Sequence, residues 1–197
     1  MAKYKSESPV FRKQGKIYKV NCDKGKPIFT HQMGRIIEQV ENMLTWHNRV
    51  FIYVFDLHVG NFTLDNKYIS VLISKLRFRL AQDYKIIRMG YMWCREQFKS
   101  VKQHYHMAIV LDGSKIQSPT KLFHKIKLIW DEVTPGGHLY GVKNSYYNIR
   151  RDTEVNKAEA IYRISYQAKV WTKDKSTARA NDYGASQIRN RASDHSL

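Results

Sequence analysis

The sequence contains only two cysteines, Cys22 and Cys94, which are far apart and in no Cys-x-x-Cys spacing. Neither a disulfide framework nor a structural zinc module is expected, and both cysteines are predicted to be reduced thiols. The chain also lacks any run near the roughly 18 consecutive apolar residues that a membrane-spanning helix needs. Its first residues, Met-Ala-Lys-Tyr-Lys, lack the apolar run of a signal peptide. We therefore expect a cytoplasmic protein with no membrane partner.

Acidic residues are scarce as well. The chain has 17 Asp and Glu against 34 Lys and Arg, which gives a net charge of +17 and a pI near 9.9. A polyanion is the expected partner of so basic a protein. Aromatic residues make up 13% of the chain, and their faces can stack on unpaired bases, which favours nucleic acid over a membrane surface. No Gly-x-x-x-x-Gly-Lys-Ser/Thr loop is present, so no nucleotide site of that type is predicted.

The pattern of apolar residues predicts a mixed fold. With 197 residues, 43% of them apolar, the chain is long enough for one domain with a sizeable core. Periodicity predicts eight elements in the order helix 31–48, strand 49–60, helix 65–80, strand 86–97, strand 104–111, helix 118–133, strand 138–149 and helix 156–172. This order indicates an α+β fold, in which helices pack on a central antiparallel sheet, chiefly on one of its faces.

The two ends of the chain differ from this middle part. Residues 1–30 carry eight Lys or Arg with little periodicity, which is typical of a basic N-terminal arm. Residues 173–197 are small and polar with almost no large apolar group, so a disordered tail is expected there. The predicted folded domain therefore spans residues 31–172.

One predicted strand, His104-Tyr-His-Met-Ala-Ile-Val-Leu111, carries two histidines at alternate positions. In an extended chain His104 and His106 project from the same face, while Tyr105, Met107, Ile109 and Leu111 project from the other. Two adjacent imidazoles can hold a divalent cation, because each offers a nitrogen lone pair. The alternative is an ordinary pair of half-exposed histidines on a sheet surface.

A carboxylate is expected beside these histidines. Glu96 lies eight residues before His104, and the strands flanking residues 98–103 are predicted to pair as an antiparallel hairpin. Glu96 would then lie opposite or nearly opposite the histidines, giving three metal ligands with open positions for substrate oxygen and water. A surface salt bridge from Glu96 to Arg95 or Lys99 is the alternative. Other candidate ligands, or ordinary polar residues, stand at the end of the preceding strand: Asp56 and His58.

The last predicted helix carries two tyrosines and a lysine on one side. At about 100° per residue, Tyr162, Tyr166 and Lys169 lie within an arc of roughly 60°, away from the stripe of Ile161 and Ile164. The tyrosines are therefore predicted to lie off the core face, where a solvated mixed face is the alternative. A phenol with cationic neighbours can become a nucleophile, and a divalent ion can offset charge on a phosphate oxygen. Together these are the parts of phosphodiester transfer to tyrosine, which needs no ATP.

In these motifs the sequence resembles the HUH superfamily of rolling-circle replication initiators and relaxases. It is most similar to the filamentous-phage-type replication initiators that share the YagK/YfjJ C-terminal domain. The superfamily's His-hydrophobe-His motif corresponds to His104-Tyr-His106, and its Tyr-x-x-x-Tyr-x-x-Lys motif to Tyr162 through Lys169. Its first motif resembles Phe55-Asp-Leu-His58, and some members carry a third ligand where this chain has Glu96. The resemblance covers roughly residues 45–172.

The resemblance implies a sheet of about five antiparallel strands with the tyrosine helix lying over the metal. The metal, Mg²⁺ or Mn²⁺, would be held by His104, His106 and Glu96. The substrate would be single-stranded or hairpin origin DNA in a prokaryotic cell or its phage or plasmid. A host helicase and polymerase would complete replication, since the chain has no helicase domain of its own.

The resemblance also implies roles for the three residues of the last helix. Tyr166 would be the first nucleophile, giving a 5′-phosphotyrosine and a free 3′-hydroxyl that primes synthesis. Lys169 would help to neutralise charge at the tyrosine or the metal. Tyr162 would be either a second nucleophile that resolves the product or a residue that stacks on DNA.

Three other functions fit the same residues. A non-catalytic nucleic-acid-binding regulator would bind DNA and fail to nick it with any metal. A different HUH enzyme, a transposase or plasmid relaxase, would share the chemistry in another process. A metal hydrolase that uses water would cut nucleic acid without forming a covalent adduct, and its activity would survive Tyr162→Phe and Tyr166→Phe together.

Overall fold

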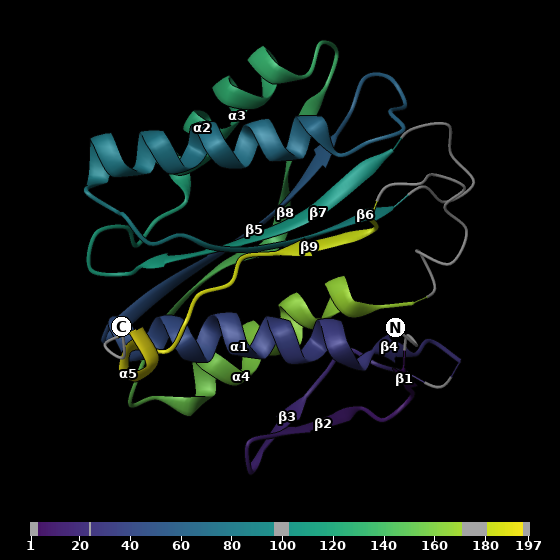
Figure 1. The fold of residues 1–197 in the computed structure, drawn as a ribbon, viewed down its shortest axis with the longest axis vertical. Coiled ribbons are helices and arrows are strands. Elements are labelled where there is room, and N and C mark those ends of the chain that lie inside the picture. The colour runs from purple at the N-terminus through teal and green to yellow at the C-terminus, as the bar shows by residue number, and fades with distance from the viewer. Residues whose placement is uncertain (1–3, 24, 97–102, 171–180, 195–197) are drawn as a thin grey trace.

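A five-strand antiparallel sheet forms the centre of the molecule (Figure 1). The computed structural model describes residues 4–23, 25–96, 103–170 and 181–194. Across the sheet the strands lie in the order β8 (His138–Arg150), β5 (Arg49–His58), β7 (His104–Asp112), β6 (Gly90–Glu96) and β9 (Tyr183–Ala185). Every neighbouring pair is antiparallel. The α+β class predicted from the sequence is confirmed.

Helices cover both faces of this sheet, whereas the sequence predicted that they pack chiefly on one. One face packs against α2 (Lys67–Tyr84) and α3 (Thr120–Val133), and the other against α1 (Thr30–Trp46) and α4 (Glu154–Ile164) (Figure 1). The reason lies in the central strands, which are apolar on both sides. In β5, Phe51 and Phe55 belong to the core under α2 and α3, while Ile52 belongs to the core under α1 and α4.

At one end of the face that packs against α1 and α4, polar side chains replace apolar ones. In β5 the alternation continues from Val54 to Asp56 and His58, and in β7 it runs from Ala108 back to His106 and His104. The strand pairs therefore change, along one face, from a closed core to a group of carboxylates and imidazoles. This end of the sheet is where the candidate site lies.

The described part of the N-terminal region is folded, which differs from the expected basic arm. Strand β1 (Lys5–Ser6) pairs with β4 (Ile28–Phe29), and β2 (Val10–Lys13) forms a hairpin with β3 (Lys16–Lys19). Gln14 and Gly15, at the tip of the hairpin, both have positive φ, the conformation that two-residue hairpin turns favour. In Figure 1 this hairpin lies beyond α4, on the far side from the sheet. Tyr18 and Ile28 are buried in the core under α1 and α4, so the region is part of the domain.

The expected C-terminal tail also contributes structure. Strand β9 pairs with β6 at one edge of the sheet, and α5 (Arg191–Asp194) follows it. Gly184 is required here, because a Cβ at this position would lie 2.5 Å from the ring of Trp93. The expectation of disorder is wrong for residues 181–194, while residues 173–180 and 195–197 lie outside the described ones. Within the described residues, no helix is both long and apolar enough to cross a bilayer.

Candidate metal centre and tyrosine turn

The register of three strands brings Glu96 and the two histidines together. Glu96 of β6 stands opposite His104 of β7, and Asp56 of β5 stands opposite His106. Directly opposed residues of an antiparallel pair project from the same face. The sequence-based prediction that a β6–β7 hairpin places Glu96 beside the histidines is therefore confirmed.

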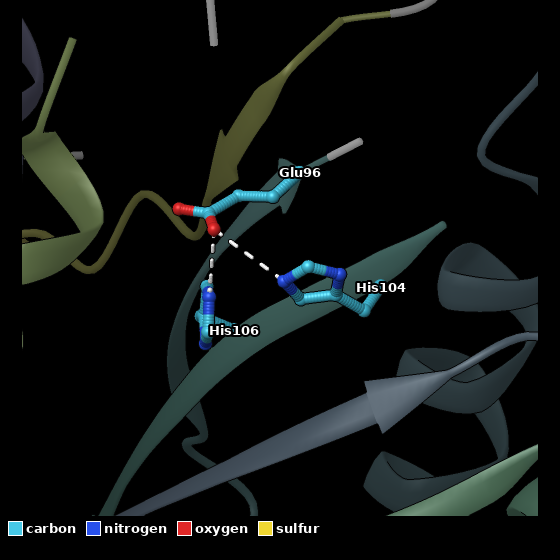
Figure 2. A group of neighbouring side chains, drawn as sticks. All are labelled: Glu96, His104 and His106. Carbon is cyan, nitrogen blue, oxygen red and sulfur yellow. Dashed lines mark hydrogen bonds and ion pairs between the residues drawn. The ribbon is translucent and has the colours of Figure 1, made fainter. Parts of the chain in front are cut away.

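The side chains of this triad converge on one carboxylate oxygen (Figure 2). Glu96 Oε2 lies 3.0 Å from His106 Nε2 and 3.4 Å from His104 Nε2. One ligand atom from each residue lies within 4.8 Å of the other two. The side chain of Glu96 is only 4% exposed, and those of His104 and His106 are 20% and 16% exposed. The alternative of a surface salt bridge to Arg95 does not apply, because the buried Arg95 guanidinium bonds to the loop before α2. Lys99, the other partner named in that alternative, lies outside the described residues.

Asp56 fixes the orientation of His106 from the other side. The distance between His106 Nδ1 and Asp56 Oδ1 is 2.6 Å, and an ionised carboxylate only accepts, so Nδ1 carries the proton. This leaves Nε2 directed at Glu96. Burial by itself disfavours the charged imidazole, but the bonds to Asp56 and Glu96 outweigh it and raise the pKa of His106 to about 10. The metal-free site therefore holds a proton between its two carboxylates.

Two imidazole nitrogens and a carboxylate oxygen at these distances fit a divalent cation. The cation would take the place of the proton that Glu96 and His106 share, since a ligating imidazole must be deprotonated. A carboxylate that holds the far nitrogen of a ligating histidine is the usual outer partner at such sites, and Asp56 has this position. Imidazole nitrogens suit Zn²⁺ and Fe²⁺, whereas carboxylate oxygens suit Mg²⁺ and Mn²⁺, so this mixed set of ligands does not select among these ions.

Tyr166 lies against this triad, on a different element from the one predicted. The α-helix α4 ends at Ile164, and a 3-10 turn, Ser165–Ala168, carries the tyrosine. The ring of Tyr166 meets that of His106 edge-on, with centroids 5.1 Å apart and an angle of 85°. Burial, together with the negative charge of Glu96, raises the pKa of Tyr166 to about 12. A cation on the triad would oppose the second of these effects.

Contacts with the N-terminal region hold the tyrosine turn in place. The Ser165 hydroxyl donates to Tyr162 O at 2.7 Å and accepts the backbone N–H of Asn21 at 2.8 Å. After the turn the chain is extended, because Lys169 bridges to Ile28 as a strand residue does. These bonds replace the helical hydrogen bonds that the apolar period predicted as far as residue 172. Residues 171 and 172 lie outside the described part of the chain.

Tyr162, Tyr166 and Lys169 were predicted to lie on one side of a single helix, but α4 ends between the two tyrosines. Lys169 Nζ lies 5.4 Å from the centre of the Tyr166 ring, so this pair stays together. Tyr162, on α4, is 38% exposed, and Lys19 lies over its ring at 5.7 Å. Among the ring contacts of the described residues, Tyr162 has none with a histidine. The two tyrosines are therefore not equivalent with respect to the triad.

Three residues beside the triad extend the group across the sheet. The ring of His58, which the sequence marked as a candidate, stacks on that of His104 at 5.1 Å and 20°. Tyr140 and His138 of β8 were not identified from the sequence. They stand opposite Asp56 and His58, and only the pairing of β5 with β8, a long-range contact, reveals this position.

Comparison with protein families matches residues 12–186 to the YagK/YfjJ C-terminal domain. The match covers most of the chain. This protein belongs to the YagK/YfjJ C-terminal domain family. All six of the predicted site residues lie within the matched span, as do strands β3–β9. The matched span is wider than the 31–172 predicted from the sequence. Comparison with curated proteins and with solved structures gave no match for this family member.

Proposed function

We propose that this protein is a metal-dependent DNA endonuclease of the HUH type, which nicks a single strand by transferring its 5′ phosphate to Tyr166. The observation that carries the proposal is the edge-on contact of Tyr166 with His106, a member of the Glu96–His104–His106 triad. A phenol beside a three-ligand cation site can act as a nucleophile towards a phosphodiester. The net charge of +17 would attract the nucleic acid that carries this phosphodiester.

The reaction is a transesterification. The Tyr166 oxygen attacks phosphorus and loses its proton to solvent, while the bond from phosphorus to the 3′ oxygen breaks and that oxygen takes up a proton. The product is a 5′-phosphotyrosine with a free 3′-hydroxyl, and attack by a 3′-hydroxyl on the same link reseals the strand. A divalent cation bound by the triad, Mg²⁺ or Mn²⁺, would stabilise the negative charge that develops on the phosphate.

The chain's own residues have distinct tasks in this proposal. Asp56 holds the His106 ring so that Nε2 faces Glu96. Lys169 lies over the Tyr166 ring and favours the phenolate, whose formation burial opposes. Tyr162 lies away from the triad, so the first cleavage is assigned to Tyr166 alone.

In the cell, the nick would start rolling-circle replication of a phage or plasmid in the cytoplasm of a prokaryote. The substrate would be single-stranded or hairpin origin DNA. A host helicase and polymerase would then extend the 3′-hydroxyl.

A denaturing gel tests this function. Purified protein is incubated with a pool of labelled single-stranded oligonucleotides, which includes DNA of the parent replicon, with Mn²⁺, with Mg²⁺ and with EDTA. The expected result is a metal-dependent labelled protein band that survives SDS and disappears in Tyr166→Phe and His106→Ala. Cleavage without a labelled protein would instead indicate hydrolysis by water, and binding without cleavage would indicate a regulator.

A further inference from the structure

Aromatic side chains continue from the triad to the edge of the sheet. Register pairs join four neighbouring strands in one row, in the order Glu96, His104, His58 and His138. A second row, two residues further along each strand, runs through His106, Asp56 and Tyr140. All of these residues project from the same face, since opposed residues of antiparallel strands do so.

The rings in these rows touch each other. His58 stacks on His104 on one side, with centroids 5.1 Å apart, and meets Tyr140 on the other side at 4.6 Å and 60°. Tyr140 also contacts the ring of His138 at 6.2 Å. A continuous series of rings therefore leads from a ligand of the candidate cation to β8, the edge strand.

Tyr140 is open to solvent although it adjoins a buried site. It is 49% exposed, whereas the tyrosines and tryptophan of the neighbouring strands β5, β6 and β7 are largely buried. Exposed tyrosines are common on protein surfaces, and Tyr140 differs from them because its ring continues the His104–His58 stack.

We propose that Tyr140, with His58 and His138, forms a subsite on which an unpaired base of single-stranded DNA stacks next to the scissile phosphate. The inference rests on the proposed function and adds to it the face of the sheet along which the strand runs, from Tyr166 across the triad to β8. Flat, partly exposed rings bind any base through its π-face, and the positive charge of the protein attracts the backbone. The subsite would therefore contribute affinity with little sequence preference.

Binding to two chemically matched probes tests the subsite without any cleavage. In EDTA, fluorescence anisotropy measures the affinity of the full chain for a labelled 20-nucleotide oligothymidine and for a 20-unit abasic strand, which keeps the phosphates and lacks the bases. Tyr140→Ala is expected to weaken binding of oligothymidine on the order of 10-fold and to leave binding of the abasic strand unchanged. Tyr140→Phe, which keeps the ring, should bind both probes as the wild type does.

Tyr146→Ala is the matched control. Tyr146 is on the same strand and is similarly exposed, at 47%, but its ring contacts Phe51 on the opposite face of the sheet. Its truncation should leave the preference for oligothymidine over the abasic strand unchanged. Thermal melting of each variant shows whether it has folded. If Tyr140→Ala has not, His138→Ala, which removes another ring of the subsite, tests stacking with the same two probes.

Two results would overturn the subsite. Tyr140→Ala that binds oligothymidine as tightly as the wild type does would exclude stacking, and so would an equal loss for both probes, which would indicate a backbone contact. If the wild type forms the covalent adduct in either case, the proposed function stands while the subsite fails. Wild-type protein that binds neither probe and forms no adduct would contradict both.

Discussion

Metal binding to the triad should release a proton, and Asp56 should control that release. Because the bonds from Asp56 and Glu96 raise the pKa of His106 to about 10, only about one molecule in 300 has a deprotonated His106 at pH 7.5. A cation must displace this proton. The apparent affinity for Mn²⁺ should therefore rise about tenfold per pH unit between pH 7 and 8.5, with close to one proton released from His106 per ion.

The Asp56→Asn substitution tests the cause. It removes the charged acceptor of the 2.6 Å bond to His106, so the pKa of His106 should fall and fewer protons should be released at pH 8.5. Loss of this outer partner should also weaken Mn²⁺ binding at pH 8.5 by about 10- to 100-fold. Calorimetric titration in two buffers of different ionisation enthalpy measures both quantities. Asp112→Asn is the control, because Asp112 also faces a histidine, His47, at 3.5 Å but lies away from the triad.

The pH dependence of folding stability follows from the same raised pKa of His106. The pKa of His106 is raised on folding, from about 6.5, so its contribution to the stability of the metal-free protein is complete below pH 6.5 and is lost as the pH rises towards 10. Mn²⁺ should oppose this loss. Mn²⁺ binding that releases no proton at pH 7.5, or an Asp56→Asn variant that titrates as the wild type does, would contradict the coupling of metal binding to the His106 proton.

Three further predictions concern stability. Phe55→Ala, at a fully buried position in β5, should lower the free energy of unfolding by about 3–5 kcal/mol, whereas Phe78→Ala, at a 61% exposed position, should change it by less than about 0.5 kcal/mol in urea titrations. Mn²⁺ at 100 times its Kd should add about 2.7 kcal/mol to stability, and His104→Ala should abolish the accompanying rise in Tm. Ser165→Ala, which leaves the N–H of Asn21 without its acceptor, should cost about 1–3 kcal/mol and reduce adduct formation more than oligonucleotide binding.

The triad was predictable from the sequence because only local rules were needed. Alternation along a strand places His104 and His106 on one face, and a short connection limits the hairpin register to values near the observed pairing of Glu96 with His104. The unbroken apolar run of β5 also indicates burial on both faces. The expectation of helices chiefly on one face overlooked that signal.

The tyrosine turn and the sheet edges were not predictable in the same way. Residues 165–168 leave the α-helix because Ser165 and the following backbone bond to the N-terminal region, and no local pattern in the helix indicates those partners. Strand β9 pairs with β6 although it is only three residues long, since a glycine can lie against Trp93. The position of Tyr140 depends likewise on which strand lies next to β5.

Peptide mapping of the covalent product shows which residue is the nucleophile. Protein that has reacted with origin DNA and Mn²⁺ is digested with protease and nuclease, and mass spectrometry locates the residual nucleotide. The expected product is a nucleotide linked through its 5′ phosphate to Tyr166, the tyrosine that contacts His106. A link to Tyr162 or to another residue in the wild-type protein, or DNA cleaved with no link to the protein at all, would contradict it.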